Sequence, residues 1–278
     1  MELYTNVSYA ISRLITIDYS TSFSSSTKLF PKQMQQHIYA IYGLVRIADE
    51  IVDTYKGKDS KELLSGLEAE VYAAIRRGYS PNPVVQSFAL TAKQFGISRT
   101  LIHPFFVSMH MDIEPVEYTK KLYERYIYGS AEVVGLMCLR VFLGGDDVAY
   151  KKLENGARSL GSAYQKVNFL RDLRADYAEL GRIYFPGVTF DTFDDTAKRA
   201  IVTDIERDFV KAKQAASKLP ASSRNAVELS ITYYEALLQK ISRTPAGVIK
   251  QQRIRLNGTA KTRLLLQATA RKAVRRGR

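Results

Sequence analysis

The chain has 278 residues, 46% of them hydrophobic, with eight prolines and sixteen glycines, which suits one large folded domain with long uninterrupted elements. Its net charge of +13 is uneven, because residues 1–240 are nearly neutral and residues 241–278 carry eleven Lys or Arg and no acid. A single cysteine, Cys138, excludes an internal disulfide, and the first twenty residues lack the pattern of a secretory signal, so a cytoplasmic protein is expected.

Apolar residues recur at three and four positions along most of the chain, which is the pattern of amphipathic helices. The apolar window 133–145 is too short to span a bilayer and is interrupted by Arg140. No train of alternating strands and no repeat of fixed period stands out, so an all-α bundle of roughly eight or more helices is predicted, with turns at 77–83 and 144–147. The predicted helices cover residues 8–23, 36–55, 61–77, 83–96, 117–144, 150–181, 197–219 and 224–242.

The stretch RIADEIVD, residues 46–53, places acids inside an otherwise apolar helical run. Asp49 and Asp53 are four positions apart, so a helix presents both carboxylates on one side. Two unpaired carboxylates in an apolar setting repel each other and lose hydration, a cost that a divalent cation removes. Taken alone, the pair is weak evidence for a metal and favours a solvated helix face, because aspartates four positions apart occur on many such faces.

A second polar stripe lies in the predicted helix over 150–181. Asn168, Asp172 and Asp176 recur every four residues and line one face over two turns, with Gln165 nearby. The neighbouring Leu170 is one of several apolar residues that indicate a packed helix rather than a free one. Acidic stripes on two bundle helices can face one cavity, as in other metal sites built between helices.

Arginines accompany both acidic stripes: Arg46 stands before Asp49, and Arg171 and Arg174 flank Asp172. Mg²⁺ typically takes one or two carboxylates plus waters and phosphate oxygens, so acids and arginines together predict a diphosphate substrate bridged by metal. Simple ion pairing within each helix is the alternative.

The basic C-terminal segment, residues 241–278, is expected to pack partly on the same domain. Its end, TRLLLQATARKAV, suits an amphipathic helix at an anionic membrane surface, which would make the protein peripherally membrane-associated. A solvated tail and contact with substrate phosphates are alternatives. Nucleic acid is not expected, because the chain has no zinc-finger spacing, no aromatic RNA-recognition motif and no tryptophan.

Several motifs in chain order resemble the squalene/phytoene synthase family, the head-to-head prenyl transferases, and bacterial phytoene synthases in particular. These motifs are STSFS, YAIYGLVRIADEIVD, YIYGSAEVVGLM and LGSAYQKVNFLRDLRADYAELGRIYFP. The last is the most specific, since it combines Gln, Asn-x-x-x-Asp-x-x-x-Asp, Gly-Arg and Tyr-Phe-Pro. The resemblance implies an all-α isoprenoid (terpenoid) synthase fold, a single helical bundle with a central cavity, whose catalytic body covers residues 1–240.

The resemblance also assigns roles to residues of this chain. It implies metal ligands at Asp49, Asp53, Asn168, Asp172 and Asp176, and a catalytic set made of the four aspartates with Tyr126 and Arg171. Core packing is the alternative for the aromatic residues. Substrate-binding positions are implied at Ser22, Phe23, Tyr42, Arg46, Gln165, Asn168 and Tyr234.

The implied activity is condensation of two geranylgeranyl diphosphates through a cyclopropyl diphosphate to phytoene, in carotenoid biosynthesis. The implied cofactor is Mg²⁺, with Mn²⁺ as a substitute, and no NADPH. The alternatives are a C30 synthase that uses farnesyl diphosphate, giving dehydrosqualene or squalene, and a non-catalytic scaffold protein of the same fold. Arg253, Lys261 and Arg263 cover a region where relatives hold diphosphate, but their register is uncertain.

Overall fold

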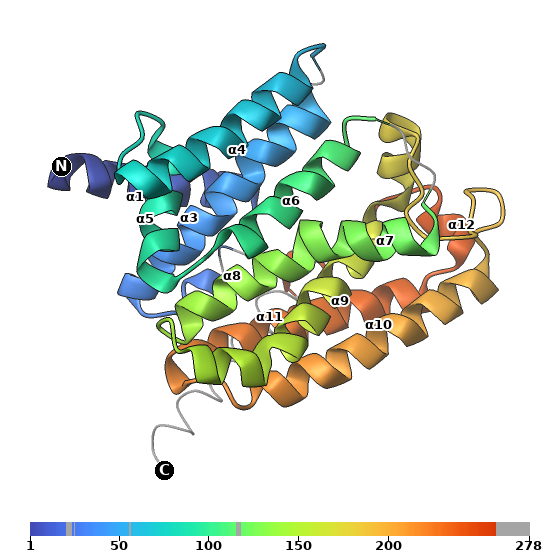
Figure 1. The fold of residues 1–278 in the computed structure, drawn as a ribbon. Coiled ribbons are helices and arrows are strands. Elements are labelled where there is room, and N and C mark those ends of the chain that lie inside the picture. Colours follow the sequence, from blue (N-terminus) through green and yellow to red (C-terminus); the bar gives the residue numbers. More distant parts are fainter. Residues whose placement is uncertain (21–23, 25, 56, 115–117, 260–278) are drawn as a thin grey trace.

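The computed structural model describes residues 1–20, 24, 26–55, 57–114 and 118–259. Within these residues every regular element is helical (Figure 1), which confirms the predicted all-α class. The elements are α1 (Glu2–Tyr19), α3 (Lys32–Asp49), the π-helical turn η1 (Glu50–Tyr55), α4 (Ser60–Arg77), α5 (Pro83–Phe95), α6 (Arg99–Met111), α7 (Lys120–Ile127), the π-helical turn η2 (Tyr128–Glu132), α8 (Val133–Phe142), α9 (Asp147–Leu180), α10 (Asp195–Ala216), α11 (Ala221–Arg243) and α12 (Ala246–Ile249).

Helix α9 is the longest element, with 34 residues, and most of the bundle is built around it. It packs against α8 and η2 on one side and against α10 and α11 on another (Figure 1). Helix α3 contacts α1, α5 and α8, so α8 joins the α3 half of the bundle to the α9 half. The two helices that carry the acidic motifs, α3 and α9, therefore both pack against α8.

Helix ends follow from local sequence at the predicted turns. The Asn82 side chain accepts from the backbone N–H of Val84 at 3.0 Å and caps α5, which begins at Pro83. Asp146 caps α9 in the same way, accepting from Val148 at 2.9 Å. These caps satisfy backbone donors that have no partner inside the helix.

Helix α6 is an element that the periodicity did not predict. Pro104 lies inside it, and a proline removes one backbone hydrogen bond and usually interrupts a helix. Phe105 and Phe106 are 1% and 0% exposed, so burial of two aromatic rings overrides the local signal. The helix ends near Asp112, which matters below.

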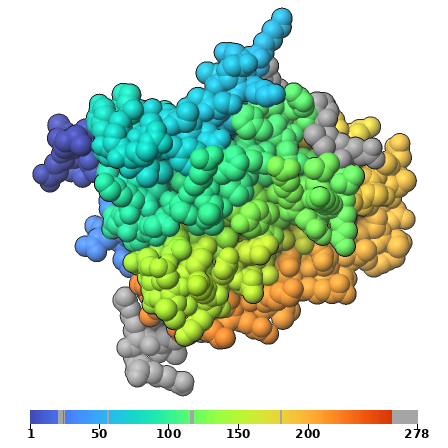
Figure 2. Space-filling model, viewed as in Figure 1, coloured from blue at the N-terminus to red at the C-terminus, as the bar shows by residue number. Residues whose placement is uncertain are grey.

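Helix α1 buries a polar face. Ser8, Ser12 and Thr16 are fully buried, while Leu3 and Leu14 are exposed. Ser12 Oγ bonds Ser87 Oγ of α5 at 2.8 Å, so the small hydroxyl groups allow close helix packing while remaining hydrogen-bonded. The N-terminal turn of α1 stands out from the body (Figure 2).

None of the helices in the described part of the chain is long and apolar enough to cross a membrane. Residues 260–278, with Lys261, Arg263 and the end of the basic segment, lie outside the described residues, so contact with an anionic membrane surface stays a prediction. Residues 241–259 pack partly on the bundle, since Ile249 and Ile254 are buried.

Candidate active site

The first acidic motif lies where α3 passes into η1. Asp49 is the last residue of α3 and Asp53 lies in the π-helical turn. Such turns are rare and often occur at functional sites. The charge of Asp53 is one cause of the raised pKa of Asp49, so the two carboxylates share one environment, as their spacing predicts.

The second acidic motif lies on α9. Asn168, Asp172 and Asp176 belong to this one continuous helix, and residues four apart share a face. Asn168 also lines an apolar cavity. The α9 stripe therefore leads from the cavity toward the carboxylates of Asp172 and Asp176.

The fold brings the two motifs together. Burial raises the pKa of Asp176 to about 7, and the charges of Asp172 and Asp53 add to the effect. Burial raises the pKa of Asp49 to about 8, and Asp53 and then Asp112 contribute further repulsion. Acids from α3, η1, α9 and the C-terminal cap of α6 thus form one electronegative cluster, which we call the acidic cluster: Asp49, Asp53, Asp112, Asp172 and Asp176.

Arginines border this cluster. Arg46 lies 3.8 Å from Asp49, forms an ion pair with Glu50, and stacks over the Tyr19 ring at 4.3 Å. Its Nε atom is buried and has no hydrogen-bond partner in the described structure. A buried donor of this kind is costly unless it meets an acceptor, and a diphosphate oxygen is a suitable one.

Asp172 is held by two arginines. Arg171 Nη2 donates to Asp172 Oδ2 at 2.5 Å, and Arg253 Nε lies 2.6 Å from Asp172 Oδ1. Arg253 follows α12, so the C-terminal segment reaches the cluster although its register could not be set from sequence. The sequence feature that pointed to Arg253 was its position in the basic C-terminal segment, residues 241–278.

Asp112 and Arg182 were missing from the predicted site. Arg182 Nη1 lies 3.1 Å from Asp112 Oδ1 and 3.4 Å from Asp53 Oδ1, and the Tyr126 hydroxyl donates to Asp112 Oδ2 at 2.8 Å. Burial raises the pKa of Asp112 to about 7, while Arg182 and Tyr126 favour its charged form. Arg182 could have been found from the Gly-Arg step of the last motif, and Asp112 only as an acid that follows an apolar run.

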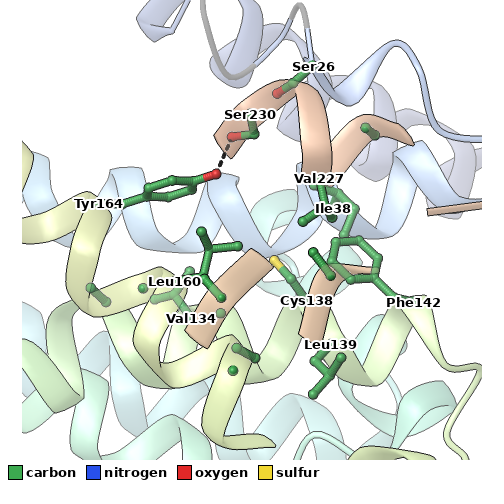
Figure 3. Close-up of a pocket in the computed structure, with 18 of the residues that line it drawn as sticks. Ser26, Ile38, Val134, Cys138, Leu139, Phe142, Leu160, Tyr164, Val227 and Ser230 are labelled. Carbon is green, nitrogen blue, oxygen red and sulfur yellow. Dashed lines mark hydrogen bonds between the residues drawn. The ribbon is translucent and has the colours of Figure 1, made fainter. Parts of the chain in front are cut away.

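A cavity of about 260 Å³ lies between α3, α8, α9, α10 and α11 (Figure 3). Its wall is mostly apolar or small, as with Val134, Leu160 and Phe142. The α9 residues in the wall run from Leu153 to Asn168, a length of about 22 Å along a helix. One end of this wall is therefore next to the acidic cluster and the other is remote from it.

Polar side chains line the part of the cavity near Asn168. Tyr164 stacks on Tyr234 with ring centroids 3.9 Å apart, and its hydroxyl donates to Ser230 Oγ at 2.7 Å (Figure 3). Tyr234 OH lies 3.5 Å from Asn168 Oδ1. Tyr164 was not a predicted site residue, because an aromatic at helical spacing is usually core packing.

The other predicted residues divide between the cavity, the cluster and undescribed positions. Tyr42 lines the cavity, and Gln165 Nε2 donates to Ser130 Oγ, also of the cavity wall, at 3.3 Å. Tyr126 contacts the cluster through Asp112 and is not in the cavity wall. Ser22 and Phe23 lie outside the described residues.

The donor chemistry of the acidic cluster and the neighbouring Asn168 fits a hard divalent cation, because these side chains offer carboxylate and amide oxygens. In the described part of the chain no three Asp, Glu, His or Cys side chains lie close enough to hold a metal by themselves. Arg171, Arg182 and Arg253 instead neutralise part of the charge. A cation that also takes phosphate oxygens from a substrate needs fewer protein ligands, so the residues fit such a shared site.

Comparison with known proteins gives a consistent result. The squalene/phytoene synthase family model matches residues 17–260. The 4,4'-diapophytoene synthase of Staphylococcus haemolyticus is 28% identical over 204 residues, 72% of this chain and 68% of the relative. The phytoene synthase of Arthrospira platensis is 32% identical over 192 residues, 64% of this chain and 61% of the relative.

Solved structures share the fold. A dehydrosqualene synthase with a bound ligand superposes with a TM-score of 0.82 at 21% identity and covers 96% of both chains. A squalene synthase from Alicyclobacillus acidocaldarius gives a TM-score of 0.76 at 21% identity, over 87% of this chain and 95% of that one. These neighbours confirm the predicted isoprenoid synthase fold.

Proposed function

We propose, since the chain belongs to the squalene/phytoene synthase family, that it condenses two geranylgeranyl diphosphates head to head into phytoene. The observation that carries the proposal is the acidic cluster beside the polar end of an apolar cavity. This arrangement offers one place for a charged head group and another for a long hydrocarbon tail. A prenyl diphosphate consists of these two parts.

The charged end would bind diphosphate. Asp49, Asp53, Asn168, Asp172 and Asp176 would hold Mg²⁺, which when bound stabilises the leaving diphosphate. Arg46 supplies a buried Nε donor for a phosphate oxygen. Guanidinium groups beside the leaving diphosphate would stabilise its developing negative charge.

The apolar end would protect carbocations. Loss of the first diphosphate leaves an allylic cation that the double bond of the second substrate attacks, and loss of a proton from the resulting cation closes the ring of a cyclopropyl diphosphate. Loss of the second diphosphate, rearrangement and loss of a proton then give phytoene. Water would quench these cations, and side chains such as Val134, Leu160 and Phe142 keep it out.

Substrate length is the finer part of the proposal. The long α9 wall of the cavity and the similarity to phytoene synthases support a C20 substrate. The similarity to a diapophytoene synthase favours a second candidate, a C30 synthase that uses farnesyl diphosphate. Both candidates use the same charged end and differ in the length of tail that the cavity takes.

Product analysis tests the proposal directly. Purified protein with Mg²⁺ is incubated with geranylgeranyl or farnesyl diphosphate, with and without NADPH, and the hydrocarbons are separated and identified by mass spectrometry. We expect a C40 product from geranylgeranyl diphosphate without NADPH. A C30 product from farnesyl diphosphate alone would establish the second candidate, and no product from folded protein would favour a scaffold role.

A further inference from the structure

Asp112 is a buried carboxylate that belongs to neither acidic motif. It follows α6, its side chain is 4% exposed, and the Tyr126 hydroxyl donates to its Oδ2 atom at 2.8 Å. Burial of a carboxylate costs free energy unless its charge is compensated. Among the described residues, the compensating cation is Arg182.

Arg182 is shared between Asp112 and the first acidic motif. Its Nη1 atom lies 3.1 Å from Asp112 Oδ1 and 3.4 Å from Asp53 Oδ1, and its Nη2 atom donates to the backbone carbonyl of Asp112. Its Nη1 atom also approaches the Tyr184 hydroxyl at 3.4 Å. Most of the contacts that fix this guanidinium therefore come from Asp112 and Tyr184, and Asp53 lies at its edge.

We propose that Asp112 is a positioning residue, which holds the Arg182 guanidinium and leaves the Asp53 carboxylate available to a divalent cation. If Asp112 were removed, Asp53 would be the nearest remaining carboxylate to the Arg182 guanidinium. A tighter Arg182–Asp53 ion pair would then compete with the divalent cation for the Asp53 oxygens. The inference rests on the proposed function, because it assumes that Asp53 takes part in binding metal and diphosphate. It adds a specific role for an acid outside both motifs.

A buried ion pair elsewhere in the bundle provides a matched control. Asp208 accepts from Lys166 Nζ at 2.8 Å and from Ser162 Oγ at 2.9 Å, between α9 and α10. Its side chain is 15% exposed. Removing its charge perturbs a buried pair of similar geometry without changing the partners of Arg182.

The test measures binding rather than turnover. Mg²⁺ is titrated calorimetrically into the full-length protein in the presence of inorganic diphosphate, after circular dichroism has confirmed folding. We expect Asp112→Asn to weaken Mg²⁺ binding about five- to tenfold, and Asp208→Asn to leave it unchanged. Unchanged binding in folded Asp112→Asn, or an equal loss in Asp208→Asn, would overturn the proposal.

A double-mutant cycle tests the route through Arg182. We expect Asp112→Asn to have no further effect on Mg²⁺ binding in an Arg182→Gln background, whereas a full additional loss there would contradict the proposed route.

If Asp112→Asn does not fold, Tyr126→Phe replaces it, because this variant removes only one hydrogen bond to the same carboxylate. Its expected effect is a smaller loss that also disappears in the Arg182→Gln background, and an undiminished loss there would refute the proposal.

The two proposals can fail separately. Normal metal binding by the wild type with no hydrocarbon product would remove the proposed function, and the effect of Asp112→Asn on that binding would still support Asp112 as a positioning residue. Phytoene formation by the wild type together with unchanged Mg²⁺ binding in Asp112→Asn would remove only the further inference.

Discussion

Helix α3 passes through two polar regions of opposite character. Near its start, His37 Nδ1 contacts Thr91 Oγ1 at 2.9 Å, and the Tyr9 hydroxyl lies 3.4 Å from the same ring atom, so buried polar groups meet neutral partners. At its end, Asp49 meets Asp53 and Asp112, which repel its charge. The first region is a satisfied hydrogen-bonded interface, and the second carries an excess of like charge.

This contrast separates structural from functional polarity. Fully paired polar groups between helices hold a fold in register and need no ligand. Carboxylates whose pKa values are raised by burial and by one another lower stability until a cation arrives. The difference predicts that the two regions affect the pH dependence of stability in opposite directions, and that only the acidic end affects turnover.

The largest expected effect is on turnover. Under the proposed function, Asp172→Ala should lower the rate of hydrocarbon formation by about a thousandfold or more while the protein stays folded, because the substitution removes one of the carboxylates that would hold the metal and stabilise charge in the transition state. Asp147→Ala is the matched control on the same helix, since Asp147 is 77% exposed and also pairs with an arginine, Arg140. Gas chromatography of the products measures the rate, and undiminished turnover in Asp172→Ala would remove the metal-site argument.

A smaller effect, on protein stability, is expected at the end of α3 where His37 is hydrogen-bonded. Burial lowers the pKa of His37 to about 4, below its usual 6.5, so the unfolded chain takes up a proton first and stability falls as the pH drops from 6.5 toward 4. Near pH 4.5 this linkage costs about 2 kcal/mol. In urea unfolding, His37→Gln should lose less stability than the wild type between pH 7 and pH 4.5; equal losses would contradict the assignment of a neutral buried ring.

The smallest effect is a gain in stability at the acidic end. Because the pKa of Asp49 is raised to about 8 from its usual 3.8, the unfolded chain releases this proton near pH 4 while the folded protein keeps it, so stability falls as the pH rises from about 4 to 8. Asp49→Asn should therefore stabilise the metal-free protein by about 1 to 2 kcal/mol at pH 8. Urea unfolding in the presence of a chelator should show the gain shrinking at pH 5, and a loss of stability at pH 8 would show that the acids are mutually satisfied.

Local sequence determined much of the fold and part of the site. The period of apolar residues located most helices, and Asn82 and Asp146 mark helix starts because their side chains cap nearby backbone donors. The spacing of Asp49 and Asp53, and of the α9 stripe, placed each set on one side of its helix. These inferences succeeded because they depend on contacts within a few residues.

Only the tertiary structure decided which distant residues join them. Helix α6 forms despite Pro104 because its aromatic residues are buried, and it delivers Asp112 to Arg182 across 70 positions of the chain. Arg253 reaches Asp172 across 81 positions. No local period encodes such contacts, since they arise when packed helices bring remote segments together, and the partners of each charge are fixed by that packing.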